Sequence, residues 1–389
     1  MQVIVSESKS IPTTPWWRND AVIFAALVAI AAIAFAATYG ITRSYQRRQD
    51  ALARRWYQRG QADLDTGNAK AAVGDFRTAL LFAPDRQEYR LRLAQALAAD
   101  NDIPQAIAYF LNLWEQQPGS GPINLELARL YARDRQSRQA AHYFNNAIYG
   151  IWPDDAVARR RQARIEYIKF LLSQQQTTQA QAEAISLAGA IPPGDEDGEL
   201  QAADLLFATG DFDHALTAYD SLLTVDPARA GVGAAKAAFQ LGYFRTAAER
   251  LRTAIEHGAD DPAAKNMLSR AETVLGLDPS QRHLSNAERA KRVSTAYVQA
   301  GTRLQECADQ KQIELKAIPP TSDLQLLYSD WSRNSSQLSQ LARDPDTRDF
   351  IMDLAFRIEA ATTAECGPSA SANDWALQML SRYGEGVER

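Results

Sequence analysis

A recurring spacing of 34 residues constrains this chain more than any other feature of its sequence. In a register starting at residue 53, positions 8 and 20 are small, position 24 is aromatic, position 27 is small or apolar, and position 32 is proline. The first unit carries these features at Gly60, Ala72, Phe76, Ala79 and Pro84. A pattern that returns at a fixed interval predicts one small structural unit repeated along the chain.

The register holds for three units and continues, with slips, for three more. Units starting at residues 87 and 121 place Phe110 and Phe144 at position 24. In the third unit Pro153 comes one place late, and the next unit, from about 161, follows an additional stretch, DDAVAR. We expect this stretch to lengthen the first helix of the fourth unit. Two further units start at 196 and at about 228.

Each unit is predicted to be a pair of antiparallel helices, so the fold class is all-α. Alanine is abundant, and valine and isoleucine are sparse outside one stretch, which favours helices. Small residues at positions 8 and 20 let the two helices approach, and the aromatic residue fills the gap to the next unit. Proline ends the second helix, and Gly67 and Gly210 fit the turn within a unit. The recurring residues are therefore structural, since only stacked units can bury their apolar faces.

At these positions the chain resembles a tetratricopeptide repeat array, over about residues 53–261, although four of six units place alanine at position 8. The resemblance implies a right-handed superhelix that captures a peptide or a helix on its concave face. The residues at the usual groove positions are Arg54, Tyr57, Gln61, Gln95, Arg129 and Arg133. Arginine and glutamine suit a peptide backbone or a carboxylate; the alternative is a solvated helix face. The lysine-and-asparagine carboxylate clamp of some family members is not reproduced.

Residues 21–42 form an uncharged stretch of 22 residues that predicts a single transmembrane helix. At about 1.5 Å per residue, such a helix crosses a hydrocarbon layer of about 30 Å. Trp16, Trp17 and Tyr39 stand near its ends, as interfacial aromatic residues do. A cleaved secretory signal and a buried helix of a soluble protein are the alternatives. Residues 1–20 would then be a short tail, and 43–52 a basic juxtamembrane linker helix.

The orientation of the span rests on two conflicting observations. Two basic residues precede it and six arginines follow it up to Arg59, which favours a cytoplasmic array by the positive-inside rule. The two cysteines, Cys307 and Cys366, instead allow a disulfide and an oxidising compartment. We expect a single-pass protein of the bacterial inner membrane. From the charge count we expect a cytoplasmic array with reduced thiols; a periplasmic array with bridged cysteines is the alternative.

The array with its capping helix is predicted to cover 53–279, and a small helical domain to cover 280–389. Ser285 is the expected N-cap of a long helix. After a linker at 318–323, helices are expected near 323–341, 346–365 and 373–383. The sequence pattern of this domain indicates no family.

The sequence offers little that suggests catalysis. Four histidines lie far apart, the acidic loop GDEDGE lacks the spacing of a calcium site, and no nucleotide-binding or hydrolase motif occurs. A net charge of −5 does not suggest a nucleic-acid partner. We therefore expect no enzyme, no cofactor and no metal.

Three functions remain open at this point. The sequence favours a membrane-anchored scaffold that binds protein or peptide partners. The alternatives are a structural subunit of a cell-envelope assembly or export complex and, less favoured, an enzyme with its site in the C-terminal 110 residues. The partner, the pathway and the oligomeric state do not follow from the sequence.

Overall fold

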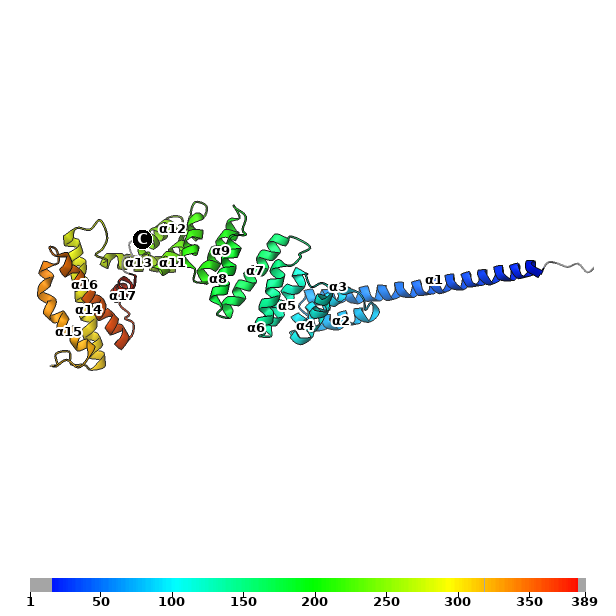
Figure 1. Ribbon diagram of the computed structural model, residues 1–389, viewed down its shortest axis with the longest axis horizontal. Helices are drawn as coiled ribbons and strands as arrows, with labels where there is room; N and C mark the ends of the chain where they lie inside the picture. Colours follow the sequence, from blue (N-terminus) through cyan, green and yellow to red (C-terminus); the bar gives the residue numbers. More distant parts are fainter. Residues whose placement is uncertain (1–15, 318, 384–389) are drawn as a thin grey trace, which may run out of the picture. The chain divides into compact units, whose positions relative to one another are not determined.

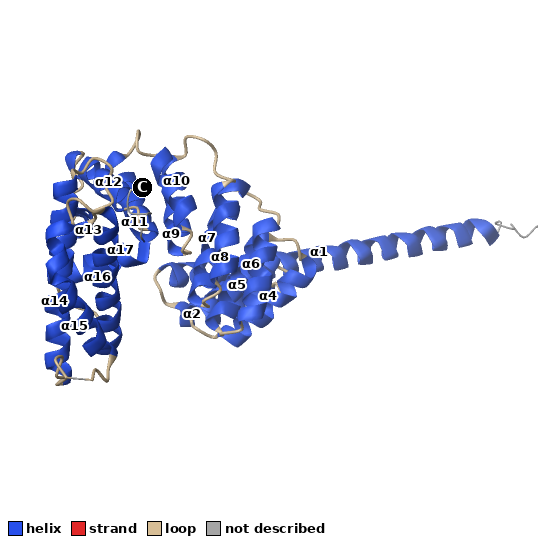
Figure 2. Cartoon of the chain, turned by 60° about the vertical axis from the view of Figure 1, so that its left-hand side comes forward, coloured by secondary structure: helices blue, strands red, loops and turns tan. Residues whose placement is uncertain are grey.

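The computed structural model describes residues 16–317 and 319–383, and it confirms the all-α class over these residues (Figures 1 and 2). Helices α1 to α17 and one 3-10 helix, η1, follow one another along the chain. In the described part, the only strand-like pairing is an isolated parallel bridge between Ser120 and Ile151. Most of the predicted tail, residues 1–15, lies outside the described residues. The chain divides into two compact units, 1–163 and 164–389.

Helix α1 (Trp16–Asp65) is a single helix of 50 residues that includes the predicted span (Figure 1). Its apolar part is exposed along its length, with a mean hydropathy of 2.6, and is a candidate membrane span. The helix continues without a break through 43–52 into the first repeat. There Ala53 is buried, and Gly60 lies against the ring of Phe76 on α2 (Ala69–Phe82). The span and the first repeat therefore belong to one helix.

The first unit contains the three repeats whose register is strict. After α2, its helices are α3 (Gln87–Ala99), α4 (Ile103–Gln116), α5 (Gly121–Arg133) and α6 (Ser137–Tyr149). Phe110 and Phe144 are 0% and 3% exposed, so the predicted register is confirmed. At the turn within each repeat the backbone is left-handed, at Gly67, Asn101 and Arg135.

The remaining repeats follow the same pattern. Their helices are α7 (Ala156–Ser173), α8 (Thr177–Ala188), α9 (Glu196–Ala208), α10 (Phe212–Ser221), α11 (Pro227–Leu241), α12 (Phe244–Glu256) and α13 (Pro262–Leu277). Helix α7 has 18 residues against 13 in α5, as the additional DDAVAR stretch predicts. Gly210 and Gly242 adopt the left-handed conformation that their turns require.

The C-terminal helices lie close to the predicted ranges. They are α14 (Asn286–Lys311), α15 (Asp323–Asn334), η1 (Ser335–Gln340), α16 (Pro345–Cys366) and α17 (Ala372–Tyr383). Ser285 caps α14 by accepting a hydrogen bond from the Glu288 amide, as expected. The segment 335–340 is a 3-10 helix instead of a continuation of α15. The domain boundary at 280 stays a prediction.

These helices share a core with the last repeat. Phe244 and Val274 belong to the same buried cluster as Tyr297 and Leu377. Phe239 on α11 stacks on Trp375 on α17, with 5.8 Å between the ring centres. The C-terminal helices thus cover an apolar face that a terminal repeat would otherwise expose to water.

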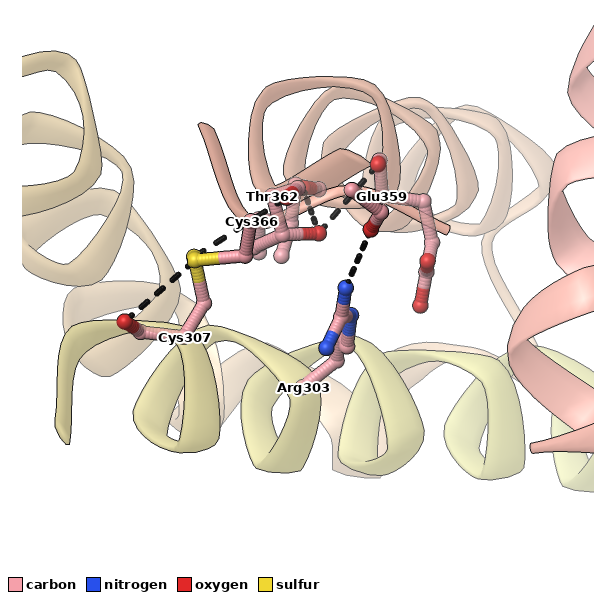
Figure 3. Close-up of a disulfide and its surroundings, with 7 residues drawn as sticks. Arg303, Cys307, Glu359, Thr362 and Cys366 are labelled. Carbon is pink, nitrogen blue, oxygen red and sulfur yellow. Dashed lines mark hydrogen bonds between the residues drawn. A yellow bond between two sulfur atoms is a disulfide. The ribbon is translucent and has the colours of Figure 1, made fainter. Parts of the chain in front are cut away.

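The expectation of reduced thiols is wrong, because Cys307 and Cys366 form a disulfide (Figure 3). Helices α14 and α16 pack side by side and bring the two Cα atoms to 5.8 Å. Cys307 itself is fully buried. A separation of 59 residues says nothing about the packing of two helices, so the sequence alone could not establish this pairing.

Candidate functional site

Helices α3 and α5, the first helices of the second and third repeats, border a cavity of about 430 Å³. We call it the groove cavity. One part of its wall is apolar, formed by Leu91, Ile123, Leu125 and Trp152. Its polar lining includes Gln95, Glu126, Arg129, Arg159 and Gln162. An apolar wall with a few polar groups is the usual composition of a ligand site.

The position of Trp152 depends on two glycines that allow close backbone contact. The Gly121 amide donates to the Ile151 carbonyl at 2.9 Å, and the Ile151 amide donates to the Gly119 carbonyl at 2.8 Å. A Cβ atom on Gly121 would lie 2.4 Å from the indole of Trp152. Trp152 Nε1 donates to the Ala147 carbonyl at 3.0 Å, which fixes the ring. The loop after α6 is therefore held against the start of α5.

A buried asparagine fixes the other side of this loop contact. Asn124 is 0% exposed, and its amide nitrogen donates to the carbonyls of Pro118 and Ser120 at 2.9 and 2.8 Å. Its side-chain oxygen accepts a hydrogen bond from Trp114 Nε1 at 3.1 Å. The turn that begins α5 is thereby held in place, and with it the cavity wall.

Two of the six predicted groove residues, Gln95 and Arg129, line the groove cavity. The Gln95 oxygen accepts from Arg92 Nη1 at 3.1 Å, and Arg129 Nη1 donates to Glu126 Oε1 at 2.7 Å. These bonds hold the polar groups in place beside the apolar wall. A fixed amide and a fixed guanidinium can pair with peptide carbonyls or with a carboxylate.

The other four predicted residues lie elsewhere in the first unit. Arg133 donates to the Ala98 carbonyl at 3.0 Å and to Asn101 Oδ1 at 2.9 Å, so it joins α5 to the end of α3. Arg54 is exposed and Gln61 is half-buried, both on α1.

Tyr57, the last of the four, belongs to an aromatic cluster. It stacks on Tyr89 with 4.6 Å between ring centres and donates to Glu88 Oε1 at 2.6 Å. Burial raises the pKa of Tyr57, and the Glu88 carboxylate raises it further, so the phenol stays a neutral donor.

Sequence reasoning missed Trp152, Arg159 and Gln162 as cavity residues. The family pattern assigns the groove to the first helix of each unit, whereas Trp152 comes from a loop between units. For Trp152 the available signal was the break in register, where Pro153 falls one place late. Arg159 and Gln162 lie on α7, the first helix of the fourth repeat, where the family pattern itself places the groove. Gly119 and Gly121 make the close backbone contact with this loop.

The described residues contain no group of three histidine, cysteine, aspartate or glutamate side chains placed to hold a metal ion. His214 Nδ1 lies 2.9 Å from the Asp211 carboxylate, and His142 Nε2 lies 3.2 Å from the Asn146 amide. Both contacts join residues of one helix end or one helix face.

The tetratricopeptide repeat family model matches residues 57–121 and 232–282. These two segments lie within the helical hairpins described above. The chain therefore contains tetratricopeptide repeats in these two segments. A tetratricopeptide repeat array generally serves as a scaffold for protein–protein interaction, and this one carries a candidate membrane span at its N-terminal side. No curated protein matches the chain.

Three solved structures are similar to part of this chain, at low sequence identity. PilF of Pseudomonas aeruginosa is 16% identical, with a TM-score of 0.38, over 57% of this chain and 98% of its own. A tetratricopeptide repeat protein from Parabacteroides merdae is 13% identical, with a TM-score of 0.32, over 57% and 99%. YrrB, described as having an unusual peptide-binding site, is 18% identical, with a TM-score of 0.37, over 49% and 96%.

Proposed function

We propose that the protein is a membrane-anchored scaffold that binds a peptide segment of a protein partner in the groove cavity. The observation that carries this proposal is the pairing of an apolar wall with fixed polar groups on α3 and α5. An apolar side chain of the partner packs against Trp152 and Ile123. Gln95 and Arg129 pair with the backbone or with a carboxylate of the same segment.

Site-specific photocrosslinking in the full chain tests this proposal. A photoreactive amino acid at Gln162, on the cavity wall, should crosslink a partner in cells; the same amino acid at Arg138, an exposed residue of α6, should not. Trp152→Ala should reduce the crosslink at least tenfold, because it removes part of the apolar wall. Equal crosslinking from both positions would refute the groove cavity as the binding site.

Membrane anchoring rests on the exposed, uncharged part of α1. The protein should stay with the membrane in alkaline carbonate and leave it only in detergent. Release by carbonate would contradict the anchor, and an N-terminus beginning after the apolar stretch in the mature protein would indicate a cleaved signal instead.

The array lies on the oxidising side of the membrane in this proposal. The arginines after the span only bias the direction in which the helix inserts. A structural disulfide is rare in reducing compartments and therefore favours the oxidising side. A phosphatase that is active only outside the cytoplasm, fused after Arg389, should be active. An inactive fusion of normal abundance, with both thiols free to alkylation, would place the array in the cytoplasm.

A further inference from the structure

A second cavity, of about 310 Å³, lies within the second unit, where the loop after α13 meets α16 and α17. We call it the bundle cavity. Three aspartates and three apolar residues determine its chemistry: Asp278, Asp349, Asp353, Met352, Phe356 and Leu380. Its volume falls at the lower end of the usual range for ligand sites. It therefore suits a single side chain better than a large cofactor.

Asp278 is the residue that points to a ligand. It is 3% exposed, and its Oδ1 accepts from the amide and the hydroxyl of Ser280 at 2.8 and 2.6 Å. Its Oδ2 is buried and has no hydrogen-bond partner among the described residues. A buried carboxylate oxygen without a partner is costly. Asp278 is also one of the residues that line the bundle cavity, so a donor bound there is an available partner for this carboxylate.

Two arginines of α14 bond mainly to backbone carbonyls around Asp278. Arg292 Nη1 donates to the carbonyls of Leu275 and Asp278 at 2.6 and 2.8 Å. Arg289 donates to the carbonyls of Pro279 and Gln281. Both thus neutralise the end of α13 and the loop that follows. Asp349 and Asp353 form no ion pair within the described part of the chain.

The apolar residues of the bundle cavity select among cations. Met352 and Leu380 are buried, and Phe356 is half-buried. They offer a surface for methylene groups, and the Phe356 ring can lie against a cationic head. Lysine and arginine combine an aliphatic stem with such a head. A bare metal ion would not use this surface, and no metal-binding group of side chains occurs among the described residues.

We propose that the bundle cavity binds a lysine or arginine side chain of a protein partner. The aspartates receive the charged head, and Met352, Phe356 and Leu380 contact its stem. This site is separate from the groove cavity. The negative charge of its aspartates favours a cationic side chain as its occupant.

Methyl NMR of the full chain in detergent micelles tests the proposal. The sequence has four methionines, so ¹³C-methyl labelling gives few signals; Met352 reports on the bundle cavity, and Met267 on α13 is an internal control. The probes are acetyl-Gly-Lys-Gly-amide and acetyl-Gly-Arg-Gly-amide, with the norleucine peptide as the uncharged isostere. The lysine and arginine peptides should shift Met352 saturably, and the norleucine peptide should not.

Paired variants separate binding from folding. Asp349→Asn combined with Asp353→Asn changes exposed residues and should weaken both cationic peptides at least tenfold, while Asp309→Asn, exposed on α14, should change nothing. Asp278→Asn should also weaken binding if its spectrum shows a folded protein. Trp152→Ala should leave the Met352 response intact, so failure of the groove cavity would not affect this result.

The proposal would be overturned by an unmoved Met352 signal, by equal shifts with the norleucine peptide, or by unchanged affinity in the double aspartate variant. A response to spermidine without one to either cationic peptide would also overturn it and assign the cavity to a free polyamine.

Discussion

The indole of Trp152 occupies the space in which a side chain on Gly121 would stand. A residue from the loop after α6 thus rests directly on the first residue of α5. The same indole forms part of the apolar wall of the groove cavity. The fold of this repeat and the shape of the cavity therefore depend on one contact.

Gly121→Ala should displace Trp152 and weaken partner binding in the groove cavity. The added Cβ would lie 2.4 Å from the ring, so the indole or the loop must move. Overpacking of this kind costs about 1–3 kcal/mol of unfolding free energy. The matched control is Gly119→Ala, whose Cβ would only touch Ile151 at 3.8 Å. Thermal unfolding and crosslinking at Gln162 measure both effects, and equal behaviour of the two variants would contradict the contact.

Loss of the disulfide should destabilise the C-terminal helices. Closing a loop of about 60 residues contributes about 4 kcal/mol in the chain-entropy account. Cys307→Ser should lower the melting temperature of the full chain under oxidising conditions. In reductant, wild type and variant should melt closely together. If the reductant leaves the melting temperature of wild type unchanged, although both thiols are shown to be free, the disulfide does not stabilise the fold.

Glu359 should make stability depend on pH near neutrality. It is fully buried on α16, and burial, with a smaller effect of the Asp374 carboxylate, raises its pKa to about 8 against an ordinary 4.5. Between these values the folded protein holds a proton that the unfolded chain releases. Stability therefore falls as pH rises from about 4.5 to about 8, by up to about 1.4 kcal/mol per pH unit from this group.

Glu359→Gln should remove this contribution. The free energy of unfolding of the variant should therefore increase relative to that of wild type as the pH rises. Denaturant unfolding at pH 5, 6, 7 and 8 measures the difference. Glu365→Gln, exposed at the end of the same helix, serves as control and should follow the wild-type profile. Parallel profiles for wild type and Glu359→Gln would show that the carboxyl does not carry the proton.

Phe144→Ala should cost about 3–5 kcal/mol, the usual range for removing a buried phenylalanine. Phe144 on α6 is 3% exposed. Leu81→Ala is the control, because Leu81 is 81% exposed on α2. Urea unfolding gives both values, and a loss below about 1 kcal/mol for Phe144→Ala would mean that the inter-repeat contact is loose.

The sequence was sufficient for the parts of the fold that repeat. Helix packing has the same geometry in every unit, so it fixes the side-chain size at each repeat position. Examples are Gly60, Phe76 and Phe110. The lengthened α7 followed from an insertion in that register. Local rules also placed Ser285 at a helix start, since capping depends on neighbouring residues only.

Features that join distant segments could not be predicted in this way. The disulfide needs α14 and α16 side by side, and no periodicity specifies which helices of a small bundle become neighbours. Trp152 enters the groove cavity from a loop that the repeat pattern leaves undefined. Glu359 reads as an ordinary charged residue of a helix, and its burial becomes evident only from the packed core.

The unbroken course of α1 has a consequence for how a bound partner would be presented. With no flexible linker between 42 and 53, rotation or tilt of the candidate span is passed directly to the first repeat. A segment bound as proposed would then be kept at a nearly constant height above the lipid headgroups, because a helix rises about 1.5 Å per residue and resists bending. Partners embedded in the same bilayer would then reach the segment at a higher effective concentration than they would if the array were held by a flexible tether.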